Sequence, residues 1–181
     1  MNNKQLLQQY VDTGVQLPEY QIKSLPSDLL KSYIRKRLIA AEGGGGLSDY
    51  EFELITPEQR FQYAMKMGEY DYGISDEKFK SLTPDQRFQY AMKRIELGGG
   101  ISDKQFELLT PDQQNQYLKI KVENGNYISV KQFEFLTPDQ RFQFAMKRVE
   151  KGSYISYEKF ELLTPNQQKI FKDKGGRIVI R

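Results

Sequence analysis

A 27-residue unit recurs along this chain and constrains its fold more than any other feature of the sequence. Five blocks share a phrase close to Phe-Glu-Leu-Leu-Thr-Pro-Asp-Gln-Arg-Phe-Gln-Tyr-Ala-Met-Lys-Arg, and they begin at residues 47, 74, 101, 128 and 155. A fixed period of this size is typical of repeat proteins, in which each unit buries its apolar face against its neighbours. We number the positions of a repeat from 1 to 27, so that Ile74 occupies position 1 of its repeat.

The first half of each repeat predicts a short helix. Ser at position 2 is a preferred N-cap, because its hydroxyl accepts a hydrogen bond from a backbone N–H of the first turn. In the repeat of Ile74 the helix is expected over residues 76–82, and it must stop before Pro84, because a residue that precedes proline is pushed out of the helical region. Residues of a capping box occur at this point as Ser48 with Glu51 and as Ser129 with Gln132.

The second half predicts a longer helix. A Thr-Pro-Asp-Gln phrase, with Glu or Asn sometimes in place of Asp, supplies an N-cap, a proline at the first helical position and a capping-box Gln. It begins at the same position in five repeats: Thr56, Thr83, Thr110, Thr137 and Thr164. Apolar residues at positions 15, 18, 19 and 22 fall on one stripe of this helix. Glycines after it predict left-handed caps, as at Gly73, Gly125 and Gly152.

These patterns predict an all-α fold, and the layout resembles the broad class of α-solenoids built from helix pairs. The tetratricopeptide and ankyrin signatures are absent, and 27 residues is shorter than either of those repeats. We expect a single repeat domain over residues 1–181 with a short extended C-terminal tail. Its parts are a partial capping unit (1–16), a degenerate repeat (17–46) and the repeats 47–73, 74–100, 101–127, 128–154 and 155–181.

Composition narrows the chemistry that this chain could perform. Among its 181 residues there is neither Cys nor His, which removes thiolate sites and the commonest general base and metal ligand. An enzyme is therefore disfavoured, and we expect no cofactor and no metal. No signal peptide or membrane span is evident, so the expected location is the cytoplasm, or a host cytoplasm or virion for a viral gene. Richness in Lys, Asn, Gln and Tyr suits a phage or other viral source.

A stripe on the longer helices is the main candidate for binding. Positions 14, 17 and 21 lie three and four residues apart, on one side of a helix. A stack of repeats would turn them into a ladder of cations and rings that could hold phosphates or bases. Alternatively, the rings belong to the core and the cations cover them. The candidate residues are Arg60, Tyr63, Arg87, Tyr90, Arg94, Tyr117, Lys121, Arg141, Phe144 and Arg148.

Places where repeats differ supply further candidates. Gly68 is expected to end its helix early and to leave Tyr70 and Tyr72 in a loop that could meet a partner. The apolar tail residues could add a strand to a partner's sheet or cover the last apolar face of the array: Ile178, Val179 and Ile180. Residues 47–73 carry six acidic and two basic side chains, whereas residues 155–181 carry three acidic and six basic ones, so self-association is a further hypothesis.

The leading functional hypothesis is a non-enzymatic scaffold or adaptor that binds protein partners within a larger assembly. The alternative is a helical repeat protein that binds nucleic acid through the ladder of Arg and aromatic residues. The net charge of +3 does not decide between them, because nucleic-acid binders usually concentrate Lys and Arg on one face.

Overall fold

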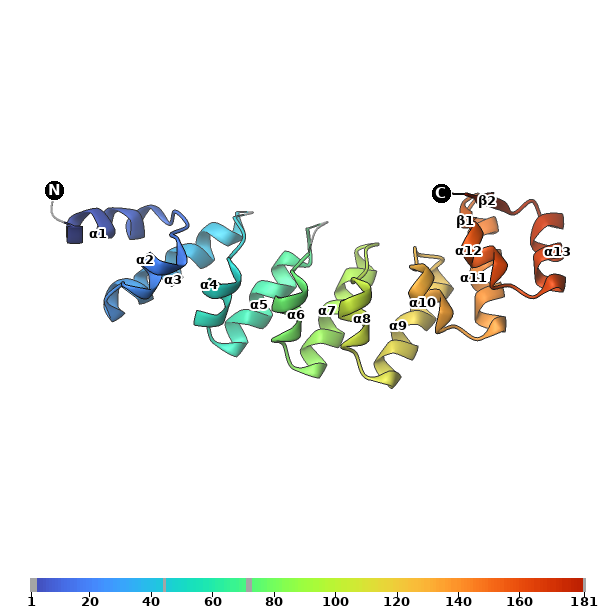
Figure 1. Ribbon diagram of the computed structural model, residues 1–181, viewed down its shortest axis with the longest axis horizontal. Helices are drawn as coiled ribbons and strands as arrows, with labels where there is room; N and C mark the ends of the chain where they lie inside the picture. The colour runs from blue at the N-terminus through green and yellow to red at the C-terminus, as the bar shows by residue number, and fades with distance from the viewer. Residues whose placement is uncertain (1–2, 44, 71–72, 181) are drawn as a thin grey trace. The chain divides into compact units, whose positions relative to one another are not determined.

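The computed structural model describes residues 3–43, 45–70 and 73–180, and this part of the chain is mostly helical (Figure 1). It forms two compact units, Met1–Leu82 and Thr83–Arg181, each of which has its own packing. The all-α prediction is therefore confirmed, apart from two three-residue strands. None of the described helices combines the length and the apolar character that a membrane span requires.

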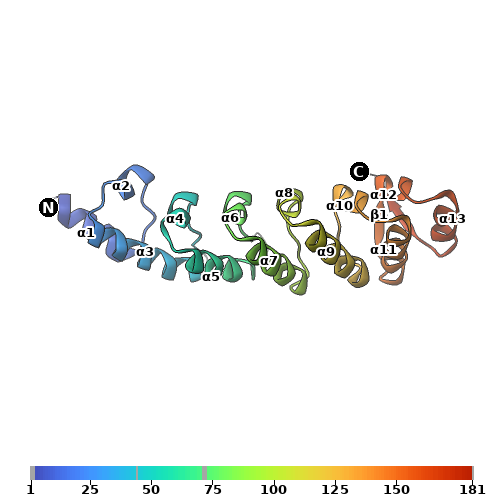
Figure 2. The ribbon, with the colours of Figure 1, turned by 90° about the horizontal axis from the view of Figure 1, so that it is seen from below.

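The first unit alternates short and longer helices. Its elements are α1 (Asn3–Thr13), α2 (Glu19–Lys23), α3 (Ser27–Glu42), α4 (Asp49–Leu54), α5 (Pro57–Met67) and α6 (Asp76–Lys80). Within this unit α1 packs on α3, and α4 packs on α6. The short helices α2, α4 and α6 lie on one side and the longer α3 and α5 on the other (Figure 2). The core at its N-terminal end consists of Val11, Leu17, Ile22, Leu25, Leu29 and Tyr33.

The second unit repeats this alternation. Its elements are α7 (Pro84–Glu96), α8 (Asp103–Glu107), α9 (Pro111–Asn124), α10 (Val130–Glu134), α11 (Pro138–Glu150), β1 (Tyr154–Ser156), α12 (Tyr157–Glu161), α13 (Pro165–Asp173) and β2 (Arg177–Val179). Longer helices pack in succession, α7 on α9, α9 on α11 and α11 on α13, and the short helices α8, α10 and α12 do the same. Each layer therefore joins equivalent elements of successive repeats.

Aromatic pairs hold the two helices of a repeat together. The Phe at position 6 of the short helix meets the ring at position 17 of the longer helix in an edge or tilted arrangement. Ring centroids are 5.7 Å apart for Phe106 and Tyr117, and 5.6 Å apart for Phe133 and Phe144. Such geometry is favourable because the positive edge of one ring faces the negative face of another.

The helix starts agree closely with the sequence. Each of the five Thr residues at position 10 caps its longer helix and completes a capping box with the Gln three residues later. The short helices end earlier than expected, since α6 stops at Lys80 rather than at residue 82. The second expected capping box at position 2 is half formed: Ser129 accepts from the backbone of Gln132, but the Gln132 side chain donates to the carbonyl of Ile101 instead.

Helix ends also follow the glycines. Gly125 has φ 58° and ends α9 in the left-handed conformation, which glycine adopts without a steric penalty. The expected early end of α5 is confirmed, because Met67 is its last residue and Gly68 is its C-cap.

The C-terminal tail is extended, as predicted, and it pairs with a strand that the sequence did not reveal. β2 lies parallel to β1, with Ile178 opposite Ile155 and Val179 opposite Ser156. The tail therefore adds a strand within its own chain, which supplies hydrogen-bond partners for the start of the last repeat.

Candidate functional site

The aromatic residues at position 17 lie in the core rather than on a surface. All four candidates of this kind are buried: Tyr63, Tyr90, Tyr117 and Phe144. The hydroxyl of Tyr63 accepts a hydrogen bond from the backbone N–H of Leu47 at 3.0 Å, and Tyr117 accepts one from Ile101 at 3.2 Å. Each ring thus ties the longer helix to the first residue of its own repeat. As placed, these rings offer no face on which a nucleotide base could stack.

The Arg residues at position 14 bind backbone carbonyls. Nε and a terminal nitrogen of Arg141 donate to Phe133 and Glu134, in the last turn of the short helix, at 3.3 and 2.8 Å. These carbonyls have no partner within their own helix. The other terminal nitrogen reaches Leu162 of the next repeat at 3.4 Å. Arg60 likewise donates to carbonyls in the last turn of its own short helix, and Arg87 donates to a carbonyl of the next repeat.

The cations at position 21 bind the loops between repeats. Arg148 donates from Nε to the carbonyl of Tyr154 at 3.1 Å and from a terminal nitrogen to that of Gly125 at 3.2 Å, so it joins two successive loops. Arg94 donates to Gly100, and Lys121 donates to Gly99. The predicted ladder is therefore accounted for by core rings and by cations that bind backbone carbonyls.

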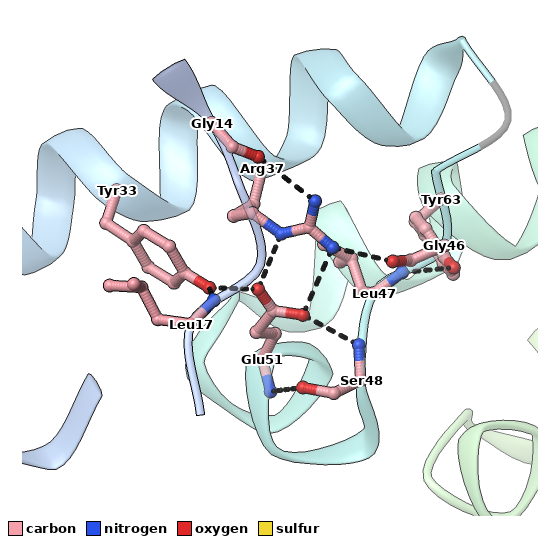
Figure 3. Close-up of polar contacts among 9 residues, drawn as sticks. All are labelled: Gly14, Leu17, Tyr33, Arg37, Gly46, Leu47, Ser48, Glu51 and Tyr63. Atoms are coloured by element: carbon pink, nitrogen blue, oxygen red, sulfur yellow. Dashed lines mark hydrogen bonds and ion pairs between the residues drawn. The ribbon is translucent and has the colours of Figure 1, made fainter. Parts of the chain in front are cut away.

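A buried ion pair occupies the equivalent place in the first unit (Figure 3). Nε of Arg37, at position 21, donates to Oε1 of Glu51 at 2.7 Å, and the Glu51 side chain is fully buried. The same carboxylate accepts from the Tyr33 hydroxyl at 2.5 Å and from the Ser48 backbone N–H at 2.7 Å. Arg37 also donates to the carbonyls of the two flanking loops, at Gly14 and Gly46. This set of contacts holds the carboxylate in its charged form.

The electrostatics of this pair agree with its geometry. Burial by itself would raise the pKa of Glu51, but hydrogen bonds from Arg37 and Tyr33 outweigh it and hold the pKa below the ordinary value of 4.5. Burial, together with the hydrogen bond to Glu51, raises the pKa of Tyr33 to about 12. The first unit therefore contains a charged carboxylate and a neutral phenol at neutral pH.

Position 5 lies near position 21 of the preceding repeat at Glu51, Gln132 and Lys159, and its residue type changes along the chain. In the first unit it is Glu51 and then Lys78, whose Nζ pairs with Asp49 at 2.7 Å. In the second unit it is Gln105, Gln132 and Lys159, all of which are buried. The charges at this position therefore differ between repeats. Glu51 forms an ion pair with Arg37, whereas Lys159 lies beside a second cation, Arg148.

The Lys159 site brings two cations together. Lys159 is 4% exposed, and burial, followed by the neighbouring Arg148 guanidinium, lowers its pKa to about 8. Neither cation forms a salt bridge within the described residues. Both line a hollow of about 240 Å³, whose wall also includes Val179 of β2 and Glu158. The hydroxyl of Ser156, on the same wall, is buried and has no partner at hydrogen-bond geometry in the described part of the chain.

Two tyrosines flank this hollow. Tyr127 and Tyr154 occupy position 27, where the earlier repeats have glycine, and Tyr127 is 69% exposed. Nζ of Lys159 lies 4.6 Å from the Tyr127 ring centroid, and Cζ of Arg148 lies 6.0 Å from that of Tyr154. Lys159, Tyr127 and Tyr154 were not among the residues expected from the sequence. The change from glycine to tyrosine at position 27 is the signal that could have revealed the two rings.

The remaining candidate residues lie elsewhere. Tyr70 is half-buried just beyond the end of α5, and Tyr72 lies outside the described residues. Ile178 and Val179 belong to β2 and are half-buried, whereas Ile180 is exposed. One edge of β2 pairs with β1, and strand addition to a partner stays a prediction.

Four acidic residues of the first unit form ion pairs within it: Glu19, Asp49, Glu51 and Glu69. Asp49 accepts from Lys78 and from the Ser75 hydroxyl, and the hydrogen bond from Lys78 contributes most to lowering its pKa. Within the residues that the structure describes, no group of three or more acidic side chains is arranged to hold a metal ion.

No protein-family model matches the chain, and searches of curated proteins and of solved structures also gave no match.

Proposed function

We propose that this chain is an α-solenoid of helix pairs that acts as a non-enzymatic protein-interaction module, a scaffold or adaptor within a larger assembly. The repeat structure supports the proposal, since the same bond between position 13 of one repeat and position 11 of the preceding repeat recurs along the second unit. Nε2 of Gln113 donates to the carbonyl of Pro84, and Nε2 of Gln167 donates to that of Pro138, in both cases across 29 residues. Such repeated contacts build an extended surface from small units.

Exposed tyrosines are the observation that carries the choice of a protein partner. In the second unit Tyr127, Tyr154 and Tyr157 are all exposed, whereas the rings at positions 6 and 17 of its repeats lie in the core. Tyrosine is enriched at protein interfaces because its ring supplies contact area and its hydroxyl remains able to hydrogen bond. The ladder residues, by contrast, are buried or bind backbone carbonyls, which favours a protein partner over nucleic acid.

The test is affinity purification of the tagged chain from its native extract, with and without nuclease, followed by cross-linking mass spectrometry. We expect a protein partner that is retained after nuclease treatment and is cross-linked near α12. The double variant Tyr127→Ser, Tyr154→Ser should lose the partner, whereas Tyr20→Ser, which changes an exposed tyrosine of the first unit, should keep it. Release of the partner by nuclease would instead support the nucleic-acid alternative.

A further inference from the structure

The Arg37–Glu51 site and the Arg148–Lys159 site have equivalent loop carbonyls around the Arg, but the two sites differ in charge. In the first unit the Arg37 guanidinium donates to the loop carbonyls of Gly14 and Gly46 and to the Glu51 carboxylate. In the second unit the guanidinium of Arg148 donates to the equivalent carbonyls, at Gly125 and Tyr154. The residue that corresponds to Glu51 is here Lys159. The two Arg residues therefore bind equivalent loop carbonyls, but Nε, which binds Glu51 in Arg37, binds the carbonyl of Tyr154 in Arg148, and the anion is replaced by a second cation.

We propose that the hollow between Arg148 and Lys159 binds a carboxylate side chain, Glu or Asp, from an acidic segment of a protein partner. This inference depends on the proposed interaction function and assigns it a site. The carboxylate would lie between Arg148 and Lys159 and take the role that Glu51 has toward Arg37. Arg148 retains a terminal nitrogen that makes no hydrogen bond within the described residues, so a donor remains for this ligand.

The surroundings suit such a ligand. The hollow of about 240 Å³ is large enough for a carboxylate side chain, given that a water molecule has a share of about 30 Å³ in the liquid. The rings of Tyr127 and Tyr154 flank it and could cover the aliphatic part of the incoming side chain. Two neighbouring cations in a partly buried site attract an anion more strongly than the same cations in water, because the local dielectric constant is lower.

The net charge of the C-terminal region also favours an acidic partner. Residues 128–181 contain eleven Lys and Arg against six Asp and Glu, an excess that favours association with acidic segments. The Glu158 carboxylate belongs to the wall of the hollow, and its charge opposes the lowering of the Lys159 pKa. It is exposed, and a hydrogen bond to its own backbone N–H at the start of α12 lowers its pKa. Glu158 forms no salt bridge to Arg148 or Lys159 in the described part of the chain.

The test is fluorescence anisotropy with a fluorescein-labelled, C-terminally amidated hexaglutamate peptide at low salt. We expect hexaglutamate to bind at least tenfold more tightly than hexaglutamine. Lys159→Glu should weaken hexaglutamate binding at least tenfold, because the introduced carboxylate pairs with Arg148 as Glu51 does with Arg37. Lys169→Glu makes the same change of charge at an exposed position of α13, and it should weaken binding less than threefold.

Two further measurements keep the result interpretable. Lys159→Glu should raise the melting temperature by about 2–4 °C, since it replaces a repulsive pair by an attractive one. Lys159→Gln introduces the residue found at this position in two other repeats, so it should fold normally and bind hexaglutamate more weakly than the wild type.

Several outcomes would overturn the proposal. Equal losses for Lys159→Glu and Lys169→Glu would mean that the charge of the whole surface, not the hollow, attracts the peptide. Tighter binding of a phosphoserine peptide than of hexaglutamate would assign the site to phosphate instead. If Lys159→Glu still captured the partner found by affinity purification, the carboxylate site would be wrong although the interaction function stood.

Discussion

The buried ion pair of the first unit allows a quantitative test of the structure. Replacing Arg37 by Met leaves the Glu51 carboxylate without its guanidinium in a site that is fully buried. Methionine is a suitable replacement, because Met67 occupies the same position in the next repeat. Removing one partner of a buried pair costs about 3–5 kcal/mol, since the remaining charge is desolvated without compensation. We expect Arg37→Met to lower the free energy of unfolding by that amount at pH 7.

A double-mutant cycle with Glu51→Gln separates the ion pair from the rest of the contacts. Glutamine can still accept from the Ser48 N–H, as Gln105 accepts from Ser102 in another repeat. In this background Arg37→Met loses only packing and the bonds to the loop carbonyls, so its cost should fall to about 1–2 kcal/mol. The expected coupling energy is therefore about 2 kcal/mol or more.

The assay is urea unfolding of the full chain, followed by far-ultraviolet circular dichroism, for the wild type, both single variants and the double variant. Arg35→Met is the matched control, because Arg35 is exposed on the same helix, and it should change stability by less than about 0.5 kcal/mol. A cost below about 1 kcal/mol for Arg37→Met, or strictly additive effects in the cycle, would refute the argument.

Three further predictions concern the second unit. Burial, followed by the charge of Arg94, lowers the pKa of Lys121 to about 8, below its unfolded value of 10.5. The wild type should therefore gain stability from pH 8 toward pH 10, and Lys121→Met should reduce that slope in urea unfolding at pH 7.5 and 9.5; an unchanged slope would contradict this. Tyr117→Phe should cost about 1–3 kcal/mol in urea, because the Ile101 N–H loses its acceptor, and no loss would argue against the bond. Thr137→Ala should cost about 1 kcal/mol through the lost N-cap, and Thr137→Ser should retain most of that stability.

The helix starts could be predicted because their determinants are local. The Thr-Pro-Asp-Gln phrase contains the cap, the first helical residue and the capping-box partner within four residues, and the structure has a helix start at each Thr. Ser129 shows the limit of this reasoning. Nε2 of its expected capping-box partner Gln132 donates to the carbonyl of Ile101, 31 residues away, and a local pattern contains no information on a distant contact that orients this amide.

The candidate site depended on contacts that cross between repeats, and these were less predictable. Position 21 was identified as part of a surface ladder, but its partner at position 5 lies in the next repeat and was not considered. Consequently the Arg37–Glu51 pair and the Arg148–Lys159 site were both missed. The pairing of β1 with β2 was missed for a similar reason, because Tyr154 and Arg177 are 23 residues apart and three-residue strands leave no alternating pattern.

The fixed spacing of contacts between repeats has a consequence for how such a chain could change its length. The bond from position 14 of one repeat to position 8 of the next spans 21 residues both at Arg87 and at Arg141, and the Ser–Asp bond spans 26 residues both at Ser75 and at Ser129. An in-frame duplication or deletion of a 27-residue window within residues 47–181 would therefore preserve the spacing of these two kinds of bond. Recombination between repeats would alter the reach of the molecule in whole steps, while a gain or loss of a few residues within a helix would disconnect both neighbours.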